Sequence, residues 1–155
     1  MAGKFEQIQQ AVIEKYRVTV SDGSDCPCGW RRTHAHVKER KICKWKQANS
    51  IRSTFTLLHE IGHIETTTSS MRRCESEYYA TVWAMERCME YDLVVPKFIV
   101  ERYQAYIDME KARGLRRGGG NYGRLNLWEV YGNEKMQKCI ANSNTFGYNK
   151  GRKVE

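Results

Sequence analysis

Several features that would place this chain outside the ordinary globular class are missing from its sequence. Only two of its 155 residues are proline, and no apolar run approaches the roughly 20 residues that a membrane-spanning helix needs. The first ten residues contain no apolar stretch of the kind found in secretory signal peptides. Apolar residues make up 41% of the chain, close to the usual globular value. We therefore expect a cytoplasmic protein with no membrane association, built as one domain or as a small domain with an appendage.

The six cysteines do not indicate a disulfide framework, because such frameworks belong to secreted proteins and no secretory signal is present. We expect reduced thiols. The net charge of +8 is unevenly distributed: residues 111–155 hold 10 basic and 3 acidic residues, whereas the first 110 residues hold 16 and 15. A basic C-terminal segment is compatible with binding to nucleic acid, and equally with simple solubilisation.

Hydrophobic periodicity predicts an α+β fold. Helices are expected over residues 3–16, 51–66, 71–91 and 97–113, the last capped by Gly114, and a short strand over 17–20. Alternating segments at 33–37 and 41–46 predict a hairpin in a small antiparallel sheet, which we expect to pack on the helix at 51–66. A Gly/Arg-rich linker at 116–120 precedes a further helix at 125–141 and a tail. The predicted domains are 1–114 and a basic linker, short helix and tail over 115–155.

The motif His-Glu-x-x-His lies within the helix predicted at 51–66 and is formed by His59, Glu60 and His63. Residues four apart share one helix face, so both imidazoles can bind the same ion, and two imidazoles suit Zn²⁺. Glu60 is rotated by about 100° from His59, so it flanks the ion and can take a proton from zinc-activated water. The motif thus predicts a zinc cofactor bound by His59 and His63, with Glu60 as general base.

A catalytic zinc site normally has three protein ligands, so a third residue is needed. Glu75 and Glu77 lie at the start of the next predicted helix. We favour Glu77, because its helix face continues into small and apolar residues that suit the interior, whereas Glu75 lies about 200° away around the helix. Glu75 and the more distant Asp92 stay as alternatives. So does the interpretation that both glutamates are solvated helix acids.

A second pattern follows the His-Glu-Ile-Gly-His segment in the next predicted helix and just after it, comprising Glu77, Ala80, Trp83, Ala84 and Pro96. Together the two patterns resemble the ImmA/IrrE family of zinc metallopeptidases, and the resemblance covers about residues 33–96. Tyr79 and Thr81 depart from it, because the family has Glu at the first position and Asn or Asp at the second. In this family the second position orients a ligand histidine, which a Thr hydroxyl can also do.

The resemblance implies a zincin-like fold in which His59, His63 and Glu77 bind zinc as in gluzincins, and Glu60 is the general acid/base. It also implies cytoplasmic proteolysis, often on phages or mobile genetic elements, of a regulatory DNA-binding protein. The function we favour is therefore a zinc-dependent metalloendopeptidase acting on a protein or peptide substrate. The alternative is a catalytically silent zinc-containing binding module whose basic tail binds nucleic acid or a phage or host component.

Two weaker constellations complete the prediction. Residues two apart on a strand share a face, so a second, structural metal is an alternative for a cluster that comprises Cys26, Cys28, His34, His36 and Cys43. Cys-x-Cys is not the usual Cys-x-x-Cys spacing, however, and we favour reduced loop thiols and surface histidines.

An oxyanion-stabilising donor is also needed near the zinc, for which Tyr78, Tyr79 and His36 are candidates with none preferred. The strand at 33–37 is expected at the sheet edge, beside a groove for an extended substrate.

Overall fold

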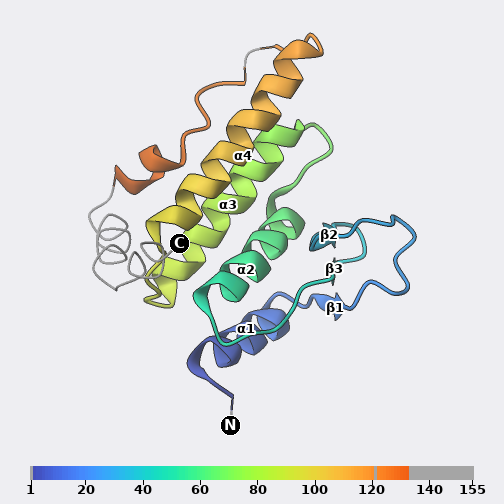
Figure 1. Ribbon diagram of the computed structural model, residues 1–155, viewed down its shortest axis with the longest axis vertical. Helices are drawn as coiled ribbons and strands as arrows, with labels where there is room; N and C mark the ends of the chain where they lie inside the picture. The colour runs from blue at the N-terminus through green and yellow to red at the C-terminus, as the bar shows by residue number, and fades with distance from the viewer. Residues whose placement is uncertain (1, 121, 133–155) are drawn as a thin grey trace, which may run out of the picture.

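Over residues 2–120 and 122–132, which the computed structural model describes, the chain forms four α-helices, a three-stranded sheet and a 3₁₀-helix (Figure 1). In chain order these are α1 (Lys4–Lys15), β1 (Thr19–Ser21), β2 (His34–His36), β3 (Lys41–Cys43), α2 (Ile51–Thr66), α3 (Arg73–Glu90), α4 (Lys97–Arg116) and η1 (Leu127–Gly132). α2 lies between the small sheet and α3, and α4 packs on α3 (Figure 1). Among these helices none combines the length and apolarity that crossing a bilayer requires. The α+β class is thus confirmed.

α2 has the bounds that the sequence predicts, and its local chemistry explains why. Ser50 caps its N-terminus, because the Ser50 hydroxyl accepts a hydrogen bond from the Ser53 amide at 3.1 Å. The predicted apolar face is buried, with Leu57, Leu58 and Ile61 fully shielded from solvent. Apolar burial of this kind, repeated at helical spacing, supplies most of the stability of a helix in a folded protein.

The sheet is mixed, and the prediction of an antiparallel sheet is wrong in this respect. β2 and β3 form the expected antiparallel hairpin, with His34 opposite Cys43. β1, however, pairs with β3 in parallel, with Thr19 opposite Lys41. In the strand order β1-β3-β2, residues 22–33 cross from one edge of the sheet to the other, and β1 runs in the same direction as β3. Strand direction depends on the path of this connection, which alternation within the strands does not encode.

Of the element ends that differ from prediction, two have identifiable reasons. Arg17 adopts a left-handed conformation with φ 52° just after α1, which delays the strand to Thr19–Ser21. Gly114 does not cap α4, which continues to Arg116 and is followed by Gly118 at φ 81°. The absence of a side chain at Gly114 instead leaves room for the phenol ring of Tyr122, which is buried against it.

The C-terminal portion returns to the helices. Leu127 is fully buried in the common core, and its amide donates a 2.7 Å hydrogen bond to the Gln104 side chain of α4. The helix predicted at 125–141 begins as the 3₁₀-helix η1, and the remainder of that prediction, like the predicted tail, lies outside the described residues. The division of the chain at residue 114 stays a prediction.

α2 and α3 approach each other closely at one point. A Cβ atom at Gly62 of α2 would lie 2.5 Å from the carbonyl oxygen of Ala80 and 3.0 Å from its Cα atom. Both residues are buried, and the atoms in the way belong to the backbone of α3, so they can move only if the helix moves. Glycine at position 62 is therefore what permits this helix separation.

We predict that Gly62→Ala destabilises the fold. Overpacking a buried contact costs about 1–3 kcal/mol, whereas Ala gains about 1 kcal/mol over Gly from helix propensity. Because the clash involves backbone, we expect a net loss of about 1–2 kcal/mol in the free energy of unfolding, measured by urea denaturation without metal.

The control for this experiment is Gly120→Ala, where the nearest atoms to a new Cβ lie 3.8 Å away on the Arg72 guanidinium. This variant should unfold like the parent protein. A Gly62→Ala variant that is as stable as the parent, or more stable, would contradict the close-packing interpretation.

Candidate metal-binding site

Three of the predicted residues converge at the contact between α2 and α3. The Nε2 atom of His63 lies 2.7 Å from Glu77 Oε2, and the Nε2 atom of His59 lies 3.4 Å from Glu77 Oε1. The three ligand atoms all lie within 4.8 Å of one another. His59 and Glu77 are buried, and His63 is half-buried. The structure thus brings together the predicted ligand set and leaves its atoms facing a common point.

Hydroxyl groups hold the far side of each imidazole ring. The Thr81 hydroxyl donates to the Glu77 carbonyl oxygen at 2.7 Å and lies 3.1 Å from His59 Nδ1, so it accepts the proton of that nitrogen. Ser76 Oγ lies 3.0 Å from Nδ1 of His63 and 2.9 Å from the Thr67 hydroxyl, so it can accept the His63 proton while donating its own to Thr67. These contacts turn the Nε2 atoms of both rings toward Glu77. Without a metal these atoms can donate a proton to the carboxylate, and with a metal they can offer it their lone pairs while Nδ1 keeps its proton. Thr81 thus orients His59 from the next helix.

The charges of this group are strongly coupled. Burial alone would raise the pKa of Glu77, but hydrogen bonds from His59 and His63 outweigh it and hold that pKa far below its ordinary value. Burial lowers the pKa of His59, which favours the neutral ring. Burial also acts to lower the pKa of His63, but the Glu77 carboxylate reverses this and raises it. The site therefore holds a buried anion that a cation can neutralise.

Glu60 lies beside the three ligands and is not one of them. Its side chain is 8% exposed and faces the same cleft. Burial raises the pKa of Glu60 to about 7, so its carboxyl group exchanges a proton near neutral pH. This is the property expected of a general base or acid at the predicted position.

The alternative third ligands lie elsewhere. Glu75 Oε1 accepts a 3.0 Å hydrogen bond from the Arg72 amide and so caps the N-terminus of α3. Asp92 follows the end of α3, in a left-handed conformation at φ 54°. Neither belongs to the converging group. The interpretation of Glu77 as a solvated acid also fails, because Glu77 is only 5% exposed.

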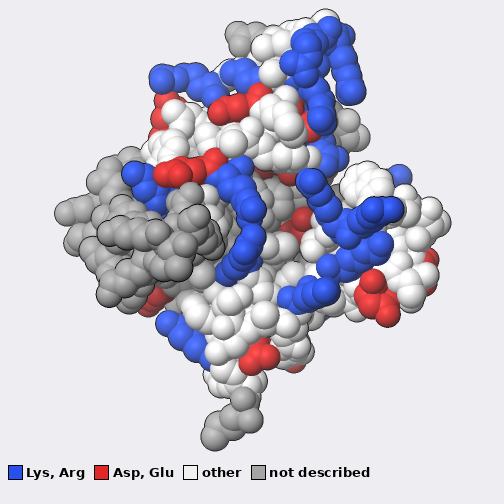
Figure 2. Space-filling view, viewed as in Figure 1, with Lys and Arg blue, Asp and Glu red and all other residues white. Residues whose placement is uncertain are grey.

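A cleft of about 600 Å³ opens over the three ligands. One wall is the edge strand β2 with the residue before it, represented by Thr33, His34 and Ala35, as the sequence predicts for a groove beside residues 33–37. The other wall comes from α3 and α4. Three arginines line the cleft: Arg73 and Arg102 on this wall, and Arg32 just before β2. Figure 2 shows Lys and Arg side chains on both sides of the hollow between the helices and the sheet, and at the far end of α4.

The tyrosines of this cleft were not among the predicted residues. The ring of Tyr103 packs on His59 with centroids 4.6 Å apart, and Tyr106 Oη accepts a 3.2 Å hydrogen bond from Arg73. Burial raises the pKa of Tyr103 well above its ordinary value, so its hydroxyl stays protonated. Tyr103 and Tyr106 are three residues apart in the helix predicted at 97–113, so the sequence indicates that both lie on one helix face, although it does not indicate that this face lines the site.

The oxyanion candidates named from the sequence do not line the cleft. Tyr79 is 43% exposed on α3, with its ring against Tyr78. His36 belongs to a separate group of metal-binding side chains with Cys26, Cys28 and His34. The expectation of surface histidines is therefore wrong for His34, which is buried, and Cys43 is a core residue outside that group.

Thr81 provides a test of how the ligands are oriented. Thr81→Val keeps the buried shape but removes the acceptor for His59 Nδ1, so we predict about 10-fold weaker binding of a divalent metal ion. Thr81→Ser restores a hydroxyl and should recover most of the affinity. Competition with a chromophoric chelator measures both values. Equal weakening in the Val and Ser variants would assign the effect to packing and contradict an orienting role.

Comparison of the chain with protein-family models, with curated proteins and with solved structures finds no match. The site is therefore characterised by its own geometry. That geometry consists of two imidazoles one helical turn apart, a buried carboxylate from the next helix within reach of both, and a second carboxyl group of raised pKa beside them.

Proposed function

We propose that this chain is a zinc-dependent metalloendopeptidase of the ImmA/IrrE kind that hydrolyses a peptide bond of a protein substrate in the cytoplasm. One observation carries the proposal: His59, His63 and Glu77 converge, with ligand atoms within 4.8 Å of one another, at a cleft that Glu60 also lines. Binding sites that only stabilise a fold have no need of a base with a pKa near 7 beside the ligands.

The donor set fits zinc. Two imidazole nitrogens and one carboxylate oxygen are a common ligand set of catalytic zinc, which has three protein ligands and keeps one position for water. Both Nδ1 atoms are already satisfied by Thr81 and Ser76, so the Nε2 atoms are left for the metal. Zinc bound there would supply a Lewis acid that polarises the scissile carbonyl and lowers the pKa of water to about 7.

The remaining steps belong to the protein's own side chains. Glu60 takes a proton from the attacking water and later passes it to the leaving amine, so the carboxyl group returns to its starting state. Negative charge that develops on the carbonyl oxygen needs donors from the cleft wall. Arg73 is the best placed, because its Nε atom lies 3.9 Å from Glu77 and another of its nitrogens bonds Tyr106.

An extended peptide is the substrate form that this cleft favours. β2 is an edge strand of the described sheet, and edge strands offer unpaired backbone groups to a peptide that adds as a further strand. Arg32, Arg73 and Arg102 line the same cleft and favour a substrate with acidic residues near the scissile bond. The regulatory DNA-binding protein implied by the resemblance is part of the proposal.

We predict that Glu60→Gln keeps the metal and loses hydrolysis by about 10²–10⁴-fold, because the amide cannot take the water's proton. The measurements are metal content by elemental analysis and initial cleavage rates on a mixture of synthetic peptides, read by mass spectrometry. Full cleavage activity in the Glu60→Gln variant would contradict the assignment of Glu60 as the base. Loss of metal from this variant would show that Glu60 is a metal ligand.

Glu65→Gln is the matched control. Glu65 lies on the same helix, but its carboxylate pairs with Arg40 at 3.1 Å and it does not line the cleft. This variant should cleave like the parent. If parent and both variants hold metal but none cleaves any peptide, while the parent binds nucleic acid, the silent binding module is the better description.

A further inference from the structure

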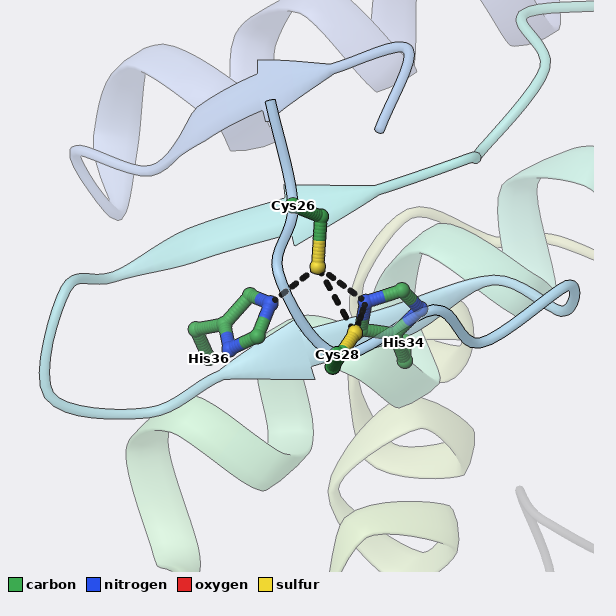
Figure 3. Close-up of side chains that lie close together, drawn as sticks. All are labelled: Cys26, Cys28, His34 and His36. Atoms are coloured by element: carbon green, nitrogen blue, oxygen red, sulfur yellow. Dashed lines mark hydrogen bonds between the residues drawn. The ribbon is translucent and has the colours of Figure 1, made fainter. Parts of the chain in front are cut away.

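A second group of metal-binding side chains lies at the edge of the sheet. Cys26 and Cys28 come from the loop between β1 and β2, and His34 and His36 come from β2 itself; all four point toward one another (Figure 3). Cys26 Sγ lies 2.7 Å from Cys28 Sγ and 3.1 Å from His36 Nε2, and His34 Nε2 lies 3.1 Å from Cys28 Sγ and 3.3 Å from Cys26 Sγ. We propose that these residues form a second, structural zinc site.

The dimensions of the group suit a tetrahedral ion. Zinc with Zn–S bonds of about 2.3 Å and Zn–N bonds of about 2.0–2.1 Å has ligand–ligand edges of roughly 3.3–3.8 Å. The observed edges of 2.7–3.3 Å reach these values if each pair separates by about 1 Å or less. Four protein ligands leave no position for water, which is the mark of a structural site.

Contacts around the group fix its geometry. The Nδ1 atom of His34 donates a 2.7 Å hydrogen bond to the Arg32 carbonyl oxygen, which leaves Nε2 as the free lone pair that faces both sulfurs. Asp25, the residue before Cys26, accepts hydrogen bonds from Ser21 Oγ at 3.0 Å and Lys41 Nζ at 2.7 Å. The loop is thereby tied to β1 and β3 immediately before the first cysteine.

The donor chemistry selects zinc among common ions. Thiolate and imidazole ligands suit zinc, whereas calcium and magnesium prefer oxygen. Binding replaces the two thiol protons by one Zn²⁺ ion and releases two protons, so the completed site is neutral. The chain has four histidines, and each belongs to this group or to the His59–His63–Glu77 group. None is left as a solvated surface residue.

A metal here would stabilise a part of the fold that has little else to hold it. The strands of the sheet are three residues long, and residues 22–33 contain no helix or strand. Zinc bound by the four residues would join the segment 22–33 to β2. This segment includes Trp30, whose ring packs edge-on against His34 with centroids 5.3 Å apart. Trp30 and His34 also line the cleft over the first site, so the second ion would set the shape of one cleft wall.

Metal counting in a background without the first site tests the proposal. The variant His59→Ala/His63→Ala should retain one zinc per chain, and X-ray absorption at the zinc edge should show two sulfur and two nitrogen neighbours. Adding Cys26→Ser and Cys28→Ser should reduce the zinc to none. Adding Cys74→Ala instead, at a buried thiol outside the group, should leave it unchanged. Unchanged stoichiometry in the serine variant, or a shell without sulfur, would overturn the site.

Alkylation of the unmodified protein gives an answer that does not depend on how the variants fold. Cys28 is exposed, so as a free thiol it would react rapidly with iodoacetamide. With zinc bound we expect Cys26 and Cys28 to resist alkylation and to become reactive together after chelator treatment, as read by peptide mass spectrometry. Rapid labelling of Cys28 in the zinc-loaded protein, or a Cys26–Cys28 disulfide in protein purified under reducing conditions, would contradict the proposal.

Discussion

The separation of α2 and α3 is the constraint on which the rest of the site depends. The carboxylate of Glu77 reaches the imidazoles of His59 and His63 because the two helices approach at Gly62 and Ala80, where no side chain larger than hydrogen fits on α2. A single methyl group at that point would have to displace the backbone of α3. The glycine inside the histidine motif is therefore a packing residue, and the ligand geometry follows from it.

This close approach has an electrostatic consequence. It buries the Glu77 carboxylate between two rings, which is unfavourable unless the charge is paired and hydrogen-bonded. Thr81 and Ser76 turn both rings so that their Nε2 atoms face the carboxylate, and either protons or a metal cation can then compensate it. Two protons on adjacent imidazoles repel each other and must be desolvated, as the lowered pKa of His59 indicates. One divalent cation bound by all three groups avoids that repulsion.

Local chemistry explains which elements could be predicted from the sequence. The Ser50 cap and a strict apolar period give α2 its bounds. In α3, the helix face of Glu77 continues into apolar residues, and this distinguishes Glu77 from Glu75. The parallel pairing of β1 could not be predicted, because it depends on the path of a loop that has no regular structure. The contact of Tyr103 with His59 depends in the same way on where α4 lies relative to α2, for which sequence spacing gives only a helix face.

β2 carries two residues of the second group and also forms part of the wall of the cleft over the first group, and this relates the sheet to the cleft. His34 turns its Nε2 atom to Cys26 and Cys28 and also contributes to the wall of the cleft over His59. An edge strand of three residues has few ladder hydrogen bonds, and a hairpin such as β2–β3 is at best marginally stable on its own. A strand that must stay unpaired on one side to accept a peptide cannot gain stability by adding a neighbour. The proposed second zinc would cross-link its side chains to the preceding loop and so stabilise the strand while leaving its edge free for the proposed peptide.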